Sequence, residues 1–203
     1  MVKKLTKTAI IGAVLQAGVI PDYADVSPKG ARWHENHLVF QWWLESKPDG
    51  SLAWSMTIGD EELDQMWKGQ GSPSILVSTI GNRSIQWPTM VDGEFESFFL
   101  DGSREARSFV RDRADLAKIL ASDSDVCRGS VYAWLPSGSF VARQVLSLII
   151  ARDIGENAII EEVLEVLHSE KLVPSYDRDV DILAKAREWA KQYSKVLGFK
   201  VEL

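Results

Sequence analysis

Large apolar residues recur at every second position on both sides of a short turn, Pro48-Asp49-Gly50. This period is typical of two antiparallel strands that bury one face. A three-residue loop with glycine in a left-handed position brings the two apolar sets to the same face. The resulting register pairs Leu44 with Trp54, Trp42 with Met56 and Phe40 with Ile58. It predicts that Trp42 and Trp54 are core residues.

Trp43 falls on the other face of the predicted hairpin, beside Gln41 and Glu45 and opposite Ser55. A large aromatic residue among polar strand neighbours is typical of a binding hot spot. We therefore predict that Trp43, Gln41 and Glu45 contact a partner. The competing interpretation is that a helix, such as the one carrying Trp189, covers this face and makes Trp43 a core residue.

The rest of the first half of the chain predicts one helix and further strands. Asp60 is expected to cap a helix that ends near Lys68. Apolar and β-branched runs bounded by turn residues predict strands over 75–80, 85–87 and 95–100, and a later strand over 131–135. Residues 1–20 predict an amphipathic helix, with Ile10 and Val14 on its apolar face. Because this segment begins with lysines and continues with an apolar run, a secretory signal is the alternative.

From Ser103 onward the apolar period becomes that of helices. Helices are expected from 103 to the polar run at Ser122, from Ser139 to Asp153, from Asn157 onward, and from Arg178 to Leu197. Strands followed by helices indicate the α+β class, with an antiparallel meander of about five to six strands, an N-terminal helix, and a C-terminal group of about three to four helices packed on it. We expect a single domain over 1–203, sheet-rich over about 1–102 and helix-rich over about 103–203.

Charge and composition exclude some classes of partner. Asp and Glu outnumber Lys and Arg by 29 to 23, for a net charge of −6. An acidic chain does not favour nucleic acid, and no apolar run approaches the ~18 residues of a membrane span. The single cysteine, Cys127, cannot form an intrachain disulfide, so we expect a cytoplasmic protein.

The negative net charge of the chain also favours a basic partner. Four glutamates crowd the start of one predicted helix, namely Glu156, Glu161, Glu162 and Glu165.

Several arginines interrupt this acidic background. Arg104, Arg107 and Arg111, followed by Lys118, share one face of the helix expected from Ser103. This basic stripe suits a phosphate or an acidic partner segment. The competing interpretation is a solvated face balanced by Glu105 and Asp115. Arg113 lies on the apolar stripe instead, so it must extend to solvent, pair with a carboxylate or face a cavity. We include these four arginines among the predicted partner-binding residues.

Motifs for catalysis or metal binding are weak in this chain. His34 and His37 have the spacing H-x-x-H of some metal ligands but lack companion ligands. Cys127 has no general base that the sequence places beside it. We therefore expect Cys127 to be a buried thiol. Residues 177–188 resemble a calcium loop, but the position that needs glycine is Ile182. We therefore predict no catalytic residue, metal or cofactor.

These observations favour a non-catalytic protein-binding protein, of the kind represented by inhibitors, antitoxins and chaperones. The partner is expected to be another protein, and a homo-oligomer is compatible with the sequence. The alternative is a small-ligand-binding or hydrolytic enzyme whose site leaves no sequence signature.

Overall fold

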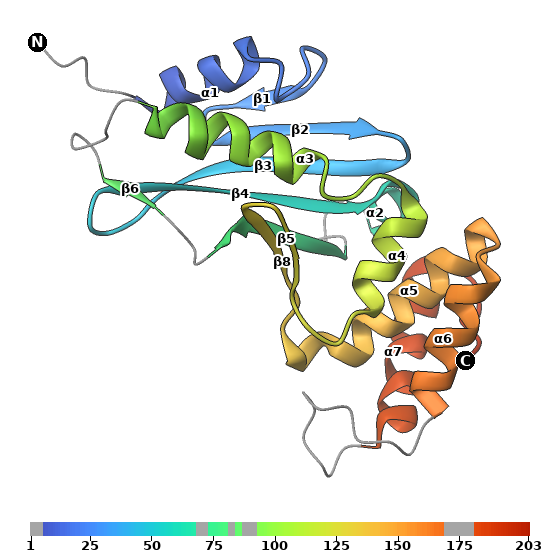
Figure 1. Ribbon diagram of the computed structural model, residues 1–203. Coiled ribbons are helices and arrows are strands. Elements are labelled where there is room, and N and C mark those ends of the chain that lie inside the picture. Colours follow the sequence, from blue (N-terminus) through green and yellow to red (C-terminus); the bar gives the residue numbers. More distant parts are fainter. Residues whose placement is uncertain (1–5, 68–72, 81–83, 87–92, 169–180) are drawn as a thin grey trace, which may run out of the picture.

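The computed structural model describes residues 6–67, 73–80, 84–86, 93–168 and 181–203, and it shows one antiparallel sheet with helices on one face and at one end (Figure 1). This arrangement confirms the predicted α+β class. None of the helices in these residues combines the length and apolar character needed to span a bilayer.

The sheet contains more strands than the five to six that the sequence predicts. Seven strands lie side by side in the order β1-β2-β3-β4-β5-β8-β7, and the two-residue strand β6 pairs with the start of β4. Their bounds in that order are β1 (Asp25–Ser27), β2 (Gly30–Glu35), β3 (Leu38–Ser46), β4 (Ser51–Asp60), β5 (Ser74–Thr79), β8 (Val131–Trp134) and β7 (Val126–Arg128), with β6 at Ile85–Gln86.

The hairpin β3–β4 has the predicted register. Trp42 pairs with Met56, Leu44 with Trp54, and Trp43 lies opposite Ser55. Gly50 has φ of 80°, the left-handed conformation that the turn requires. Trp42 and Trp54 are 0% and 1% exposed, so both are core residues as predicted.

Helices α1 (Lys7–Gln16) and α3 (Gly102–Arg107) lie across the face of the sheet that carries Trp42 and Trp54, here called the inner face (Figure 1). Trp42 Nε1 donates to Ser103 Oγ at 3.0 Å, and Trp54 Nε1 donates to the Phe98 carbonyl at 2.7 Å. These two bonds satisfy the indole N–H groups, which would otherwise be costly to bury. The opposite side of the sheet is the outer face.

Four helices form the end of the molecule beyond the sheet: α4 (Arg113–Ala121), α5 (Phe140–Ile154), α6 (Asn157–His168) and α7 (Ile182–Leu197). Of these, α7 packs against α2 (Glu61–Trp67), which Asp60 caps as predicted. Helix α5 is buried on most sides, as its sequence predicts. Its polar side chains bond α4 carbonyls, with Arg143 Nη1 donating to Leu120 O at 2.8 Å and Ser147 Oγ to Ala117 O at 2.7 Å.

Three sequence predictions about elements are wrong. The predicted strand at 95–100 is helical, and residues Glu96–Asp101 form a π-helix that continues into α3. The single helix expected from Ser103 is broken between Arg107 and Arg113, so the arginine stripe is divided between α3, the break and α4. The strands β1, β2 and β7 were not predicted. The predicted strand end at Trp87 and the calcium-like residues Asp177 and Asp179 lie outside the described residues.

Candidate functional site

The outer face of the sheet carries the residues that the sequence predicts for partner contact. Gln41 and Glu45 are exposed and flank Trp43, which is partly exposed. Trp43 Nε1 donates to Glu45 Oε1 at 2.8 Å, and this bond fixes the indole on the strand surface. The helix that carries Trp189 does not cover Trp43, because Trp189 contacts Tyr193 of its own helix, which in turn contacts Trp67 of α2.

The same face carries two further aromatic residues, on β8. The register runs from Gln41 through Thr57 and Leu76 to Trp134, so these residues form one row across four strands. Neighbouring strands are about 4.8 Å apart, which places β8 roughly 15 Å from β3. Trp134 is 50% exposed, among the largest apolar exposures of the described residues. Tyr132 stands two positions before it and is partly exposed.

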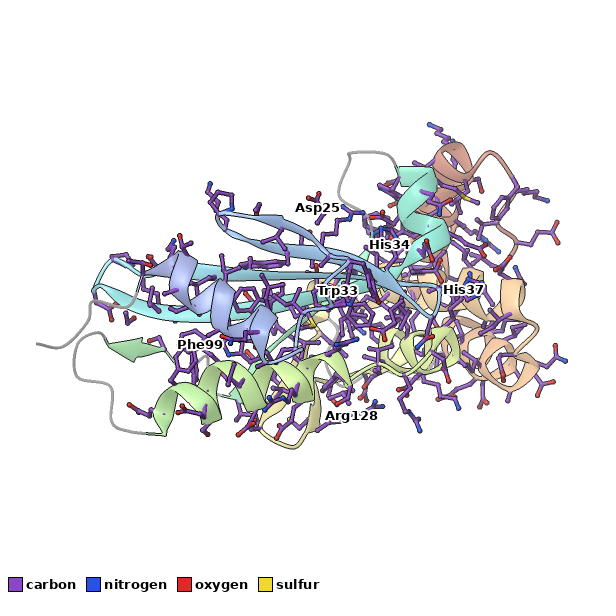
Figure 2. The ribbon with its side chains drawn as sticks, turned by 90° about the horizontal axis from the view of Figure 1, so that it is seen from above. Asp25, Trp33, His34, His37, Phe99 and Arg128 are labelled. Carbon is purple, nitrogen blue, oxygen red and sulfur yellow. The ribbon has the colours of Figure 1, made fainter. Side chains whose placement is uncertain are left out.

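One end of the outer face is covered by α2. Arg32 bonds Asp64, and His34 Nδ1 lies 3.1 Å from Glu61 Oε1. Figure 2 shows Trp33 directed to the inner face and His34 to the outer one, as expected for successive strand residues. The part that carries Trp43, Tyr132 and Trp134 lies beyond these contacts, and no described contact places a helix over it.

A second candidate site is a cavity of about 360 Å³ on the helix side of the sheet, here called the arginine pocket. It lies where the α1–β1 connection, the β2–β3 turn and the α3–α4 break meet. The structure brings together Arg104, Arg107 and Arg111 there, although they do not lie on one continuous helix as predicted, and Lys118 of the predicted stripe does not line the cavity. The other lining residues are Gly18, Val19, Glu35, Asn36, Leu38, Phe40, Ser108 and Val110.

The three arginines differ in how fully their donors are used. Arg107 makes a bidentate contact with Glu35, at 2.9 Å for Nη2 to Oε2, and also donates to the carbonyls of Gly18 and Val19. Arg104 contacts Asp101 through Nη1 at 2.8 Å, with its side chain 50% exposed. Arg111 contacts Asp115 and is 75% exposed. Arg107 therefore builds the pocket wall, whereas Arg104 and Arg111 are accessible.

Asp115 lies beneath Arg111 and is shared with a second arginine. Arg128 donates to Asp115 at 2.8 and 2.9 Å, while Arg111 Nε lies 3.2 Å away. The hydrogen bonds from Arg128 are the largest influence and hold the pKa of Asp115 well below its ordinary value, although burial opposes them. Asp115 balances Arg111, as the competing interpretation of a solvated face expects. Glu105 does not, because its Oε2 accepts hydrogen bonds from Ser130 at the β7–β8 turn.

Arg113 does not line the arginine pocket, although it is predicted with the other three arginines as a partner-binding residue. Its Nε lies 2.6 Å from Asp60 Oδ2, and its Nη1 lies 2.6 Å from Asp153 and 3.5 Å from Glu62. Burial lowers the pKa of Arg113, but these carboxylates outweigh it, so the net shift is upward. Arg113 thus pairs with carboxylates and also lines a separate cavity of about 260 Å³, as its position on the apolar stripe indicates.

The residues considered for catalysis or metal binding are scattered. Cys127 is exposed on β7, which corrects the prediction of a buried thiol. His37 lies in the β2–β3 turn with φ of 60°, and His168 is the last residue of α6. Among the residues that the structure describes, no group of three or more His, Cys, Asp or Glu is arranged to hold a metal.

Sequence reasoning missed Trp134 and Tyr132 as neighbours of Trp43 on one face. Their strand was predicted, but its place beside β5 depends on long-range pairing that no local pattern encodes.

Comparison with protein-family models, curated proteins and solved structures found no match to the chain. The site is therefore interpreted from its own geometry.

Proposed function

We propose that this chain is a non-catalytic protein-binding protein that contacts its partner with the outer face of the sheet. The observation that carries the proposal is Trp134, which is 50% exposed on the same face as Trp43. Exposed tryptophans beside polar residues such as Gln41 and Glu45 are typical of protein contacts, because large aromatic residues dominate binding energy. Inhibitor, antitoxin and chaperone roles all fit such a surface.

The charge of the molecule supports a basic partner. Glu156, Glu161, Glu162 and Glu165 are all exposed on or next to α6, and the net charge of the chain is −6. Such a field speeds the approach of a basic protein. The single cysteine and the absence of an intrachain disulfide support a cytoplasmic location. Self-association through the same face is an alternative outcome of the test below.

The test is affinity capture from the native host with quantitative mass spectrometry, using three forms of the full chain. The double variant Trp43→Ser/Trp134→Ser removes both tryptophans. The control Phe199→Ser removes an aromatic residue of matched exposure, 49%, at the helical end. We expect a protein that copurifies with the wild type and the control but is depleted at least about tenfold with the double variant, since hot-spot truncations cost about 2 kcal/mol or more.

Equal recovery of that protein with the double variant would remove the outer face as the contact surface. Circular dichroism of each form must show the native spectrum, so that loss of binding is not loss of folding. Size-exclusion chromatography with light scattering identifies self-association, which the same double variant should abolish if the outer face mediates it.

A further inference from the structure

The arginine pocket has an apolar floor beneath an accessible cationic rim. Val19, Phe40 and Val110 line it and are 1%, 3% and 2% exposed, so they form a rigid wall continuous with the core. A cavity of about 360 Å³ falls within the usual size range of small-ligand sites, roughly 300–1,000 Å³. It lies on the helix side of the sheet, so it is separate from the outer face of the proposed function.

Charge within the pocket favours a single negative group. The lining contains three arginines and one carboxylate, Glu35, and Arg107 already neutralises Glu35. Arg104 uses Nη1 for Asp101, and Arg111 uses Nε and Nη2 for Asp115. Among the described residues, no hydrogen bond occupies the other nitrogens of these two guanidinium groups. Because Asp115 is also bound by Arg128, it offsets only part of the charge of Arg111.

We propose that the arginine pocket binds an organic monocarboxylate, with the carboxylate on Arg104 and Arg111 and a short apolar body against Phe40 and Val110. A guanidinium fork matches a carboxylate in shape and charge. The apolar floor offers nothing to a naked inorganic anion. Asp101 and Asp115 already pair with Arg104 and Arg111, so the remaining positive charge suits one negative charge better than two. A free small acid and an acidic side chain of a partner protein offer the same chemistry, and the experiments below separate them.

The first experiment is isothermal titration calorimetry of the full chain with phenylacetate and 4-phenylbutyrate. Phenylacetamide serves as the neutral control for phenylacetate, and inorganic phosphate as the control for charge alone. We expect saturable binding of the carboxylates, with phenylacetamide and phosphate at least about tenfold weaker, since a hydrogen bond to a charged group accounts for roughly that factor.

The matched variants are Arg104→Gln/Arg111→Gln for the pocket and Lys118→Gln as control. Arg104 and Arg111 are exposed, so their substitution should leave the fold intact. Lys118 is an exposed cation on α4 that does not line the pocket. Carboxylate affinity should fall about tenfold or more in the pocket variant and stay unchanged in the control. Arg107 is left in place because it ties Glu35 to the carbonyls of Gly18 and Val19.

Three results would overturn the proposal: no saturable binding of either carboxylate, equal affinity in the pocket variant, or phosphate binding as tight as that of phenylacetate. If the carboxylates bind and the pocket variant also loses a protein captured from the host, the natural occupant is an acidic side chain of that protein. If capture is unchanged, the occupant is a small acid. Neither result depends on the outer face, so the two proposals fail separately.

Discussion

At the scale of single residues, Trp42 and Trp43 are neighbours in sequence with different environments. Trp42 is 0% exposed and its indole N–H bonds Ser103, whereas Trp43 is partly exposed on the outer face. We predict that Trp42→Ala lowers the free energy of unfolding by about 3–5 kcal/mol, because it leaves a cavity. Trp43→Ser should cost about 1 kcal/mol. Equilibrium denaturation measures both, and equal losses would show that the outer face is buried.

Arg113 supports a second residue-scale prediction, because its partner Asp60 is 0% exposed. Arg113→Met leaves that carboxylate buried without its cation and should cost about 3–5 kcal/mol of unfolding free energy. The double variant Asp60→Asn/Arg113→Met removes both charges and keeps a side-chain oxygen to cap α2, so it should recover a large part of the loss. If the double variant is no more stable than the single one in urea denaturation, the ion pair does not explain the cost.

The sequence indicates what Arg113 must do but not which residues it meets. A cation on an apolar helical stripe requires a carboxylate or solvent. Its partners Asp60, Glu62 and Asp153 are at least 40 residues away along the chain, so only the fold brings them together. Cys127 is the opposite case. The sequence predicts a buried thiol, but Cys127 lies exposed on a short strand near the sheet edge.

At the scale of elements, the sequence predicts best where local period and turn chemistry agree. The β3–β4 hairpin has alternating residues and a glycine turn, and its register is confirmed residue by residue. The segment 95–100 has the aromatic composition of a strand but is helical. Its consecutive residues Phe98 and Phe99 are both buried, and the Phe98 ring contacts Trp54 of the sheet, so tertiary packing overrides local preference.

The break between α3 and α4 is stabilised by Asp115 and gives a pH prediction. The pKa of Asp115 is depressed below its ordinary value of 3.8 by Arg128, so its contribution to stability is present above about pH 4 and is lost as acid protonates it. Asp115→Asn should cost about 2–3 kcal/mol at pH 7 and should flatten the fall in stability between about pH 4 and pH 2.

The matched control for this prediction is Asp101→Asn. Asp101 pairs with Arg104 but is 60% exposed, so its substitution should change stability by less than about 0.5 kcal/mol. Urea denaturation over a series of pH values provides the measurement. An Asp115→Asn curve parallel to that of the wild type throughout this pH range would contradict the role assigned to Asp115.

At the scale of the whole molecule, the two candidate sites differ in how far the sequence could predict them. Trp43 follows from strand alternation alone, since the side-chain period of a strand is two residues. The arginine pocket does not, because the predicted continuous helix is broken and Arg111 reaches the pocket from that break. The pocket also needs Phe40 and Glu35 from the sheet and Val19 from the α1–β1 connection, and no local pattern links these segments.

The last prediction concerns whether the sheet and the helical end unfold together. One buried cluster runs from Trp42 and Trp54 in the sheet to Ala186 and Tyr193 in α7, and the Arg113–Asp60 ion pair joins the two parts. We therefore predict a single cooperative transition, the behaviour of one domain. Far-ultraviolet circular dichroism reports mainly the helices, and tryptophan fluorescence in a Trp67→Phe/Trp189→Phe variant reports mainly the sheet. The two urea curves should coincide in midpoint and slope. Two separated midpoints would mean that α4–α7 form a unit that unfolds independently of the sheet.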